Sequence, residues 1–168
     1  MKLVMNAHLV IANLVFFLLV SSAVAMLGQS TLPERSKLYG MDYDNVWVAV
    51  VEVIEEREEG IRSLNKEDGV IETGFHMIDV ERLRAIANIR ASETHWAKGR
   101  YRLHIALLPV ANSETKVTVI PSIMGWRVWS GLQGEDQPAP MAPAAWVPLQ
   151  SNGALEEEIF NEVSKKLR

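Results

Sequence analysis

The feature that most constrains this chain is its apolar N-terminus. Residues 1–25 contain one charged residue, Lys2, followed by a long run of aliphatic and aromatic side chains that ends at Ala23-Val24-Ala25. A positive start, an apolar centre and an A-x-A end are typical of a signal peptide. The sequence therefore predicts cleavage after Ala25 and a mature chain that folds outside the cytoplasm.

An uncleaved membrane anchor is the alternative interpretation of the same segment. The stretch from Leu9 to Leu27 has about the length, roughly 20 residues, that a helix needs to span a bilayer. In both cases the positive N-terminus stays on the cytoplasmic side and the rest of the chain lies on the far side. We therefore expect a periplasmic protein, either soluble after cleavage near Ala25 or tethered to the inner membrane by residues 9–27.

The composition limits the partners and the chemistry of the exported part. The formal net charge is −4 and the basic residues are dispersed along the chain, so the sequence carries no electrostatic footprint for nucleic acid. Cysteine is absent, which excludes disulfides, thiolate metal sites and a lipid anchor on an N-terminal cysteine. The domain must therefore be stabilised by its hydrophobic core.

The exported part is expected to consist of a linker and one domain. Residues 26–41 contain Pro33 and show no periodicity, which is typical of a polar linker, and 42–168 form the domain. The domain begins with a predicted amphipathic helix, capped by Asp44 and ended by Gly60. Apolar residues recur at helical spacing between these two positions: Val46, Trp47, Val50, Val51 and Ile54.

Two β-hairpins are predicted after this helix. The Asp68-Gly69 pair is a strong turn signal between strands at 61–65 and 70–75. A second hairpin joins strands at 101–107 and 115–120. Alternation in the first of these two strands places its odd-numbered residues on an apolar face and Arg102 and His104 on a polar face.

Three further segments complete the domain. A short helix is expected at 80–90, and a long loop at 125–152, which holds four prolines and little periodicity. The final helix, 155–167, has apolar residues at every fourth position, acidic residues in its first turn and basic ones in its last. The sequence thus predicts an α+β fold: an antiparallel β-sheet with N- and C-terminal helices packed on one face, helix-grip-like, preceded by an N-terminal apolar helix.

No catalytic or metal-binding pattern is present. The domain's histidines, His76, His95 and His104, are dispersed and lack metal-ligand spacing. The sequence contains neither a nucleophile elbow nor a phosphate-binding glycine loop. We therefore expect a protein that is not an enzyme and that uses no metal and no cofactor.

The tryptophans are the candidate binding residues. Trp126, Trp129 and Trp146 lie in or beside the proline-rich segment, and Trp96 precedes the third strand. Exposed aromatic side chains favour contact with a partner protein. The alternative is that the segment folds back and the rings close the open end of the core. We take Trp126, Trp129 and Trp146 as candidate partner-binding residues.

Several short motifs resemble a known family. Asp44-Asn45-Val46-Trp47, the hairpin from Asp68 to Thr73, and Ser151 to Glu156 before the final helix are similar to the helix-grip domains of the outer-membrane lipoprotein component C of the bacterial β-barrel assembly machinery. Members of that family are non-enzymatic envelope lipoproteins that bind proteins, which implies an assembly or structural role here. This chain departs from the family because it has no lipid-accepting cysteine and only one such domain instead of two.

The sequence therefore favours an envelope accessory protein whose periplasmic domain binds another envelope protein. If residues 9–27 are never cleaved, it is instead a membrane-anchored accessory subunit of a larger inner-membrane complex. A periplasmic small-ligand carrier is the third possibility, since a helix gripped by a curved sheet can enclose an apolar cavity. A deep pocket beneath the final helix favours the carrier, whereas a shallow sheet with exposed aromatics favours the accessory.

Overall fold

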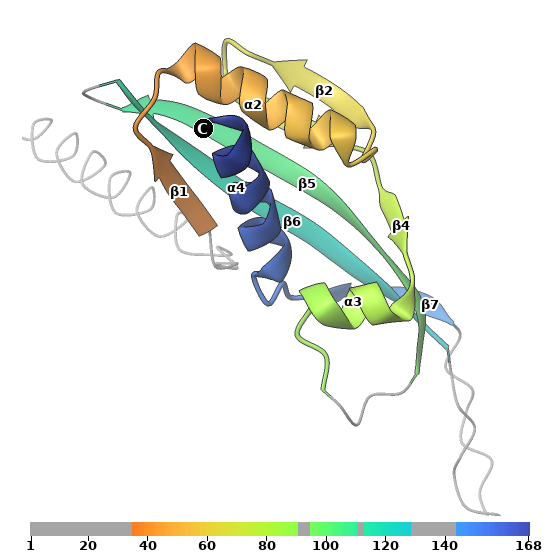
Figure 1. The fold of residues 1–168 in the computed structure, drawn as a ribbon. Coiled ribbons are helices and arrows are strands. Elements are labelled where there is room, and N and C mark those ends of the chain that lie inside the picture. The colour runs from red at the N-terminus through yellow and green to blue at the C-terminus, as the bar shows by residue number, and fades with distance from the viewer. Residues whose placement is uncertain (1–34, 91–94, 111–112, 129–143) are drawn as a thin grey trace, which may run out of the picture. The chain divides into compact units, whose positions relative to one another are not determined.

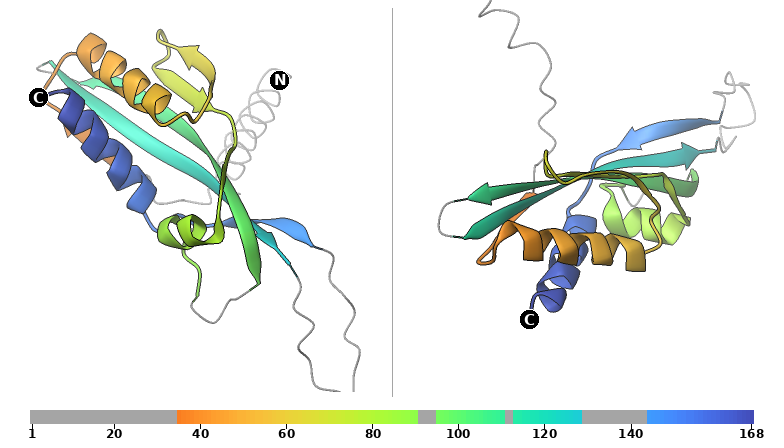
Figure 2. Two further views of the ribbon diagram at one scale, coloured as in Figure 1. Left: turned by 45° about the vertical axis from the view of Figure 1, so that its right-hand side comes forward. Right: turned by 90° about the horizontal axis from the view of Figure 1, so that it is seen from above.

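The computed structural model describes residues 35–90, 95–110, 113–128 and 144–168 of the chain (Figure 1). Within these ranges the strands form one seven-stranded sheet with antiparallel pairings, and three helices lie against one face of it (Figure 2). The predicted α+β class is therefore confirmed. The predicted signal peptide or anchor, with its apolar helix, lies outside these ranges. Within them, no helix is long and apolar enough to cross a membrane.

A long β-hairpin runs through the middle of the sheet. It consists of β5 (Trp96–Val110) and β6 (Glu114–Arg127), which pair along their whole length. Both strands extend beyond the predicted segments 101–107 and 115–120. The sequence hides these extensions because prolines and glycines interrupt the apolar alternation there.

Short strands flank the hairpin on both sides. β3 (Val70–Thr73) and β4 (His76–Ile78) pair with β5, and β2 (Ile61–Asn65) pairs with β3. On the opposite side, β1 (Arg35–Tyr39) and β7 (Ala145–Leu149) pair with different parts of β6. The first predicted hairpin is therefore confirmed as β2 and β3.

Two predicted connecting segments contain strands instead. β1 lies inside the expected linker 26–41, and β7 with the end of β6 lies inside the expected loop 125–152. Both predictions are wrong for these residues. β1 buries only Tyr39, and β7 has no fully buried residue. Because edge strands are held by backbone pairing with one neighbour, they need not show the apolar alternation that identifies a central strand.

Pro121 illustrates how β6 accommodates a residue without an N–H group. It lies opposite Leu103, whose own N–H donates to the Thr73 hydroxyl on the far side of β5 at 2.9 Å. The Leu103–Pro121 pair therefore exchanges no backbone hydrogen bond. β1 pairs with 115–119 and β7 with 123–127, so Pro121 occupies the gap between them and costs the ladder no bond.

The three helices in the described ranges are α2 (Tyr43–Glu56), α3 (Val80–Ile86) and α4 (Ala154–Lys166). They correspond to the three helices predicted for the domain. α3 is shorter than the predicted 80–90 because Ala87 takes an extended conformation and forms a bridge with Ser151.

The N-cap of α2 differs from the predicted one. Asp42 caps the helix, because its carboxylate accepts a hydrogen bond from the Asn45 backbone N–H at 2.9 Å. The predicted cap, Asp44, lies in the first turn and forms an ion pair with Lys66 at 2.8 Å. By sequence, either aspartate could be the N-cap of α2. Only the backbone angles show which one precedes the first helical residue.

The core lies between the helices and one face of the sheet. From Tyr101 to Leu107 the odd-numbered residues of β5 are buried in it, as predicted, together with the apolar residues of α2 and α4. Side chains of this kind each contribute about 1.5–3 kcal/mol when fully buried. The central members are Val46, Val50, Ile54, Tyr101, Leu103, Ile105, Leu107, Leu155, Ile159 and Val163.

Glycines in the hairpin allow close packing on this face. A β-carbon at Gly99 would lie 2.6 Å from the Leu83 Cδ1 of α3, and one at Gly125 would lie 2.6 Å from the ring of Trp96. Neither Leu83 nor Trp96 is free to move outward, since both are buried. The glycines therefore set how closely α3 and the Trp96 ring approach the sheet.

We predict that Gly99→Ala lowers the free energy of unfolding by about 1–3 kcal/mol, because the added methyl group overpacks the contact with Leu83. Urea denaturation measures the change. Gly40→Ala is the matched control, since a β-carbon at Gly40 has no atom within 4 Å. Equal stabilities of the two variants would contradict the packing argument.

Candidate functional site

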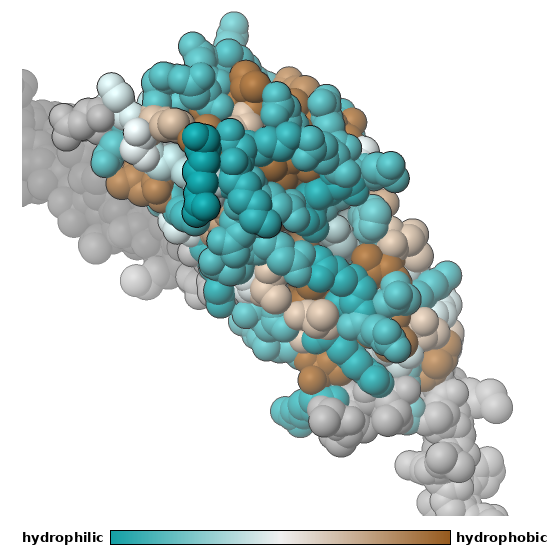
Figure 3. All heavy atoms as spheres, viewed as in Figure 1, coloured by the Kyte–Doolittle hydropathy of each residue, from teal (hydrophilic) through white to brown (hydrophobic). Residues whose placement is uncertain are grey.

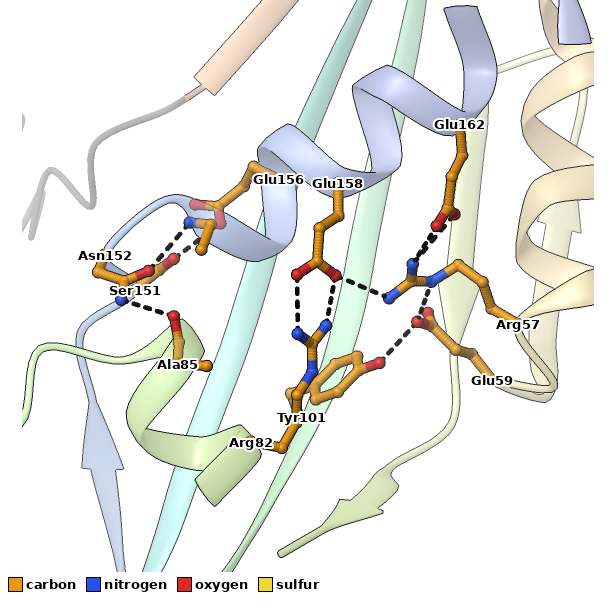
Figure 4. A network of polar contacts seen from close by, with 11 residues as sticks. Arg57, Glu59, Arg82, Ala85, Tyr101, Ser151, Asn152, Glu156, Glu158 and Glu162 are labelled. Atoms are coloured by element: carbon orange, nitrogen blue, oxygen red, sulfur yellow. Dashed lines mark hydrogen bonds and ion pairs between the residues drawn. The ribbon is translucent and has the colours of Figure 1, made fainter. Parts of the chain in front are cut away.

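Two polar clusters occur on opposite sides of the sheet, and the first joins the helices. Arg57, at the C-terminal end of α2, donates from Nε to Glu59 at 2.7 Å and from Nη1 to both oxygens of Glu162 at 3.0 Å (Figure 4). The Arg82 guanidinium of α3 forms a two-pronged ion pair with Glu158 of α4. α4 is thereby tied by charge to both other helices.

The buried member of this cluster is Glu59, whose side chain has 0% exposure. Its Oε1 also accepts a hydrogen bond from the Tyr101 hydroxyl of β5 at 2.7 Å, and its Oε2 has no partner among the residues that the structure describes. Burial, together with this hydrogen bond, raises the pKa of Tyr101 to about 12, so its hydroxyl stays protonated. Burial alone would lower the pKa of Arg57, but Glu59 raises it above its usual value.

The residues that open the final helix form an extension of this cluster. The Ser151 hydroxyl donates to the buried carboxylate of Glu156 at 2.8 Å, and the Asn152 amide donates to the Ala85 carbonyl of α3 at 2.8 Å (Figure 4). Gly153 has φ of 92° and precedes the helix. The motif Ser151 to Glu156 thus attaches the start of α4 to α3, which is a structural role.

The hydrogen bonds of this first cluster connect elements of the fold. Each cation in it is neutralised by a carboxylate, and the helix-covered side of the molecule presents mainly hydrophilic side chains (Figure 3). We therefore assign the cluster to stability.

The second cluster lies on the open face of the sheet, opposite the helices. Residues that are directly opposed in neighbouring strands share a face. The register of β5, β6 and β7 places Lys98, Trp126 and Trp146 in one row across the strands, and the next row contains Arg100 and Met124. These even-numbered residues of β5 alternate with the buried odd-numbered ones.

Arg100 is the centre of this cluster. Its guanidinium carbon lies 4.2 Å from the ring centroid of Phe75 and 4.2 Å from that of Trp146. Since β5 lies between β4 and β7 in the sheet, the two rings reach Arg100 from opposite sides. Arg100 also donates to the Met124 sulfur at 3.4 Å, while its Nε has no partner in the described part of the chain.

Two more cations extend the cluster along β5. Lys98 Nζ lies 5.9 Å from the Trp126 centroid and 5.8 Å from the Trp146 centroid, and the two tryptophan rings meet edge to face at 5.3 Å. The Arg102 guanidinium lies 5.3 Å from Phe75. These are distances at which a ring face attracts a cation. We call the six residues the aromatic–cation array: Phe75, Lys98, Arg100, Arg102, Trp126 and Trp146.

The cations of the array differ from those of the helix side in their partners. Within the described ranges, Lys98, Arg100 and Arg102 form no ion pair with a carboxylate. On the helix side, Arg57, Arg82 and Lys166 each have a carboxylate within 3.0 Å. The array therefore presents positive charge that its own aromatic rings hold in place but do not neutralise.

A hollow of about 260 Å³ adjoins the array on the same face. Its lining includes Arg102 of the array together with Arg62, Glu72, His104 and Ser122. His104 Nδ1 lies 3.5 Å from Glu72 Oε1. In the part of the chain that the structure describes, no group of three or more His, Asp or Glu side chains could hold a metal ion.

The structure separates the tryptophans named as candidates. Trp126 and Trp146 are brought together as neighbours in β6 and β7, although the sequence placed them in a loop, and Trp129 lies outside the described residues. Trp96 instead packs over Gly125 on the helix side, because the register shifts between Trp96 and Lys98. The alternative that a ring closes the core therefore holds for Trp96.

Sequence reasoning missed the cations and Phe75. The signal for the cations is visible, because Lys98, Arg100 and Arg102 occupy alternate positions, as they do on one face of a strand. Arg102 was placed on the polar face of the predicted strand, but Lys98 and Arg100 lay outside that strand because it began at 101. Phe75 has no such signal, since it lies between β3 and β4 and reaches the array through the fold.

No protein-family model matches the chain, and no curated protein matches it. The resemblance to component C of the β-barrel assembly machinery thus rests on the short motifs given above.

We predict that Arg57→Met lowers the free energy of unfolding by about 3 kcal/mol or more, because it leaves the buried Glu59 carboxylate without its cation. Lys66→Met is the control, since it breaks the exposed ion pair with Asp44 and should cost less than about 1 kcal/mol. Chemical denaturation measures both. A loss for Arg57→Met no larger than that of the control would contradict the role assigned to this cluster.

The ion pair between Arg82 and Glu158 predicts a pH dependence. The hydrogen bond from Arg82 holds the pKa of Glu158 below its usual value. A lowered folded-state pKa adds stability above the unfolded-state value of about 4.3, and this stability is lost as the pH falls through the folded-state value. The stability difference between the natural chain and Glu158→Gln should therefore shrink from pH 7 to pH 3. A difference that stays constant over this range would contradict the prediction.

Proposed function

We propose that the chain is a non-enzymatic accessory protein of the cell envelope whose sheet domain binds another envelope protein. The observation that carries the proposal is the aromatic–cation array, three ordered and unneutralised cations held by aromatic rings on a sheet face that no described helix covers. Arginine and tryptophan are the residue types that most often dominate the binding energy of protein interfaces. The N-terminal signal supports the envelope location.

The exposure of the array supports contact with a large partner. Phe75 is 44% exposed, and Met77, which is directly opposite Arg100, is 51% exposed. The array follows the paired strands β5, β6 and β7 across the open face, and the hollow of about 260 Å³ lies beside it. A flat surface with aromatic anchors fits a protein better than a small molecule, which needs a concave site.

The space beneath α4 argues against the small-ligand carrier. Leu155, Ile159 and Val163 are completely buried against the sheet, and Phe160 is 3% exposed. Well-packed side chains therefore occupy the place where a carrier would hold its ligand.

We include a helix-grip-like fold in the proposal, and the arrangement of the helices supports it. α2 and α4 lie beside each other on one face of the antiparallel sheet (Figures 1 and 2). In the sequence, α2 lies near the start of the domain and α4 at its end. In this proposal the helices serve to hold the sheet, and the opposite face serves to bind. Whether the chain acts in solution or as an inner-membrane subunit depends on the cleavage after Ala25.

Site-specific photo-crosslinking in the cells that naturally produce the chain tests the proposal. A photoreactive residue at Met77 on the open face should yield one discrete crosslinked protein. Val48 on α2 is the matched control, because it is also 51% exposed but lies on the helix side. Crosslinks of equal yield at both positions, or none at Met77, would overturn the proposed binding face.

The mass of the chain recovered from these cells tests its location. We expect a mass that corresponds to a start at Met26, because the A-x-A sequence ends at Ala25. A full-length mass would instead establish the anchored form and remove the soluble one.

A further inference from the structure

The geometry of the array indicates the chemistry of the partner. This inference rests on the proposed function, since it describes what the partner presents to the open face. Lys98, Arg100 and Arg102 lie at alternate positions of one strand, so their backbone positions follow each other at about 6.6–6.8 Å. A ligand that meets all three must carry negative groups in a row with a similar repeat.

The aromatic rings restrict the side-chain conformations of the cations before a ligand binds. A guanidinium between two aromatic rings keeps its charge and its planar N–H edge, while it loses the freedom to adopt other rotamers. Because this ordering takes place during folding, binding costs less side-chain entropy. Arg100 donates from Nη2 to Met124 and its Nε is buried, so the Nη1 end of the guanidinium is the part left to donate a charge-assisted hydrogen bond to a carboxylate.

An extended polypeptide has the required repeat. Its alternate side chains point to one side and follow each other at about 6.6–6.8 Å, the spacing of the three cations. Asp or Glu at alternate positions would therefore face Lys98, Arg100 and Arg102 together. The hollow beyond Arg102 offers room for one further side chain, and both a cation, Arg62, and a carboxylate, Glu72, line it.

A large polyanion fits these observations less well than a short acidic segment. The chain has a net charge of −4, which repels an extended negative surface such as an anionic membrane. The three cations along β5 form one row that attracts a negative ligand on this face. A flat layer of lipid headgroups would also leave the hollow beside them unfilled. Local charge and spacing, not net charge, must therefore select the ligand.

We propose that the aromatic–cation array binds an extended acidic segment of the partner protein, laid along β5, in which Asp or Glu occupies alternate positions. The aromatic rings of Phe75, Trp126 and Trp146 order the cations and contact the apolar parts of that segment.

Synthetic peptides test this inference on the full-length chain. The probe peptide has glutamate at three alternate positions and threonine elsewhere. A second peptide has the same composition with its glutamates adjacent, and a third has glutamine in place of glutamate. The tryptophan fluorescence of the chain reports binding, because Trp126 and Trp146 belong to the array. We expect the alternating peptide to bind at least fivefold more tightly than the other two.

Charge variants of the chain assign the effect to the array. Arg102→Gln removes an exposed cation and should weaken binding of the alternating peptide about tenfold, the order expected for the loss of a hydrogen bond to a charged group. Arg84→Gln is the matched control, since Arg84 is exposed on α3 and forms no ion pair within the described ranges. Its affinity should stay within twofold of the natural chain. Circular dichroism verifies that both variants fold.

Several outcomes would overturn the inference. Equal affinity for the alternating and adjacent glutamates would show that spacing is not recognised, and equal affinity for the glutamine peptide would show that charge is not. Tighter binding to phosphatidylglycerol vesicles than to any peptide would assign the array to a lipid surface. If the Met77 crosslink persists while the peptides fail, the inference is wrong and the proposed function stands. If the alternating peptide binds but no crosslink forms at Met77, the inference about acidic segments stands and the proposed binding of a cellular partner at this face is wrong.

Discussion

The two-residue repeat of the β5–β6 hairpin is the constraint on which the rest of the structure depends. From Tyr101 to Leu107 the odd-numbered side chains of β5 are buried beneath α2 and α4, so the even-numbered ones must point to the opposite face. Burial of Leu103 and Ile105 therefore also determines where Arg100 and Arg102 lie. A register shift of one residue would exchange the two faces. Burial of the core residues therefore fixes the register and, with it, the residues that form the binding surface.

The two faces of the sheet use charge in different ways. On the helix side, Arg57 and Arg82 are neutralised by carboxylates of α4 and of the loop after α2, and these pairs hold the helices together. On the open side, Lys98 and Arg100 contact aromatic rings and, for Arg100, the Met124 sulfur, but form no ion pair in the described ranges. Paired charge stabilises the domain, and unpaired charge leaves interaction energy for another molecule. This division links the fold to the proposed function.

Much of the fold was predictable because its signals are local. The helical spacing in α2 and α4, the Asp68-Gly69 turn and the alternation at 101–107 each depend on residues that are close in sequence. β1 and β7 were missed because their stability comes from pairing with β6, and their own side chains are largely exposed or half-buried. The cap of α2 was placed two residues late for a similar reason, since Asp42 and Asp44 are distinguished only by backbone conformation.

The candidate site shows the same boundary between local and tertiary information. The sequence by itself determined that Trp126 and Trp146 are candidate binding residues and that three cations, Lys98, Arg100 and Arg102, occupy alternate positions. Only the tertiary structure decided that Phe75 and Trp146, which are far apart in sequence, both contact Arg100, and that Trp96 turns into the core. The physical reason is that sequence periodicity specifies which face a residue occupies within its strand, whereas the order and register of the strands specify which residues meet.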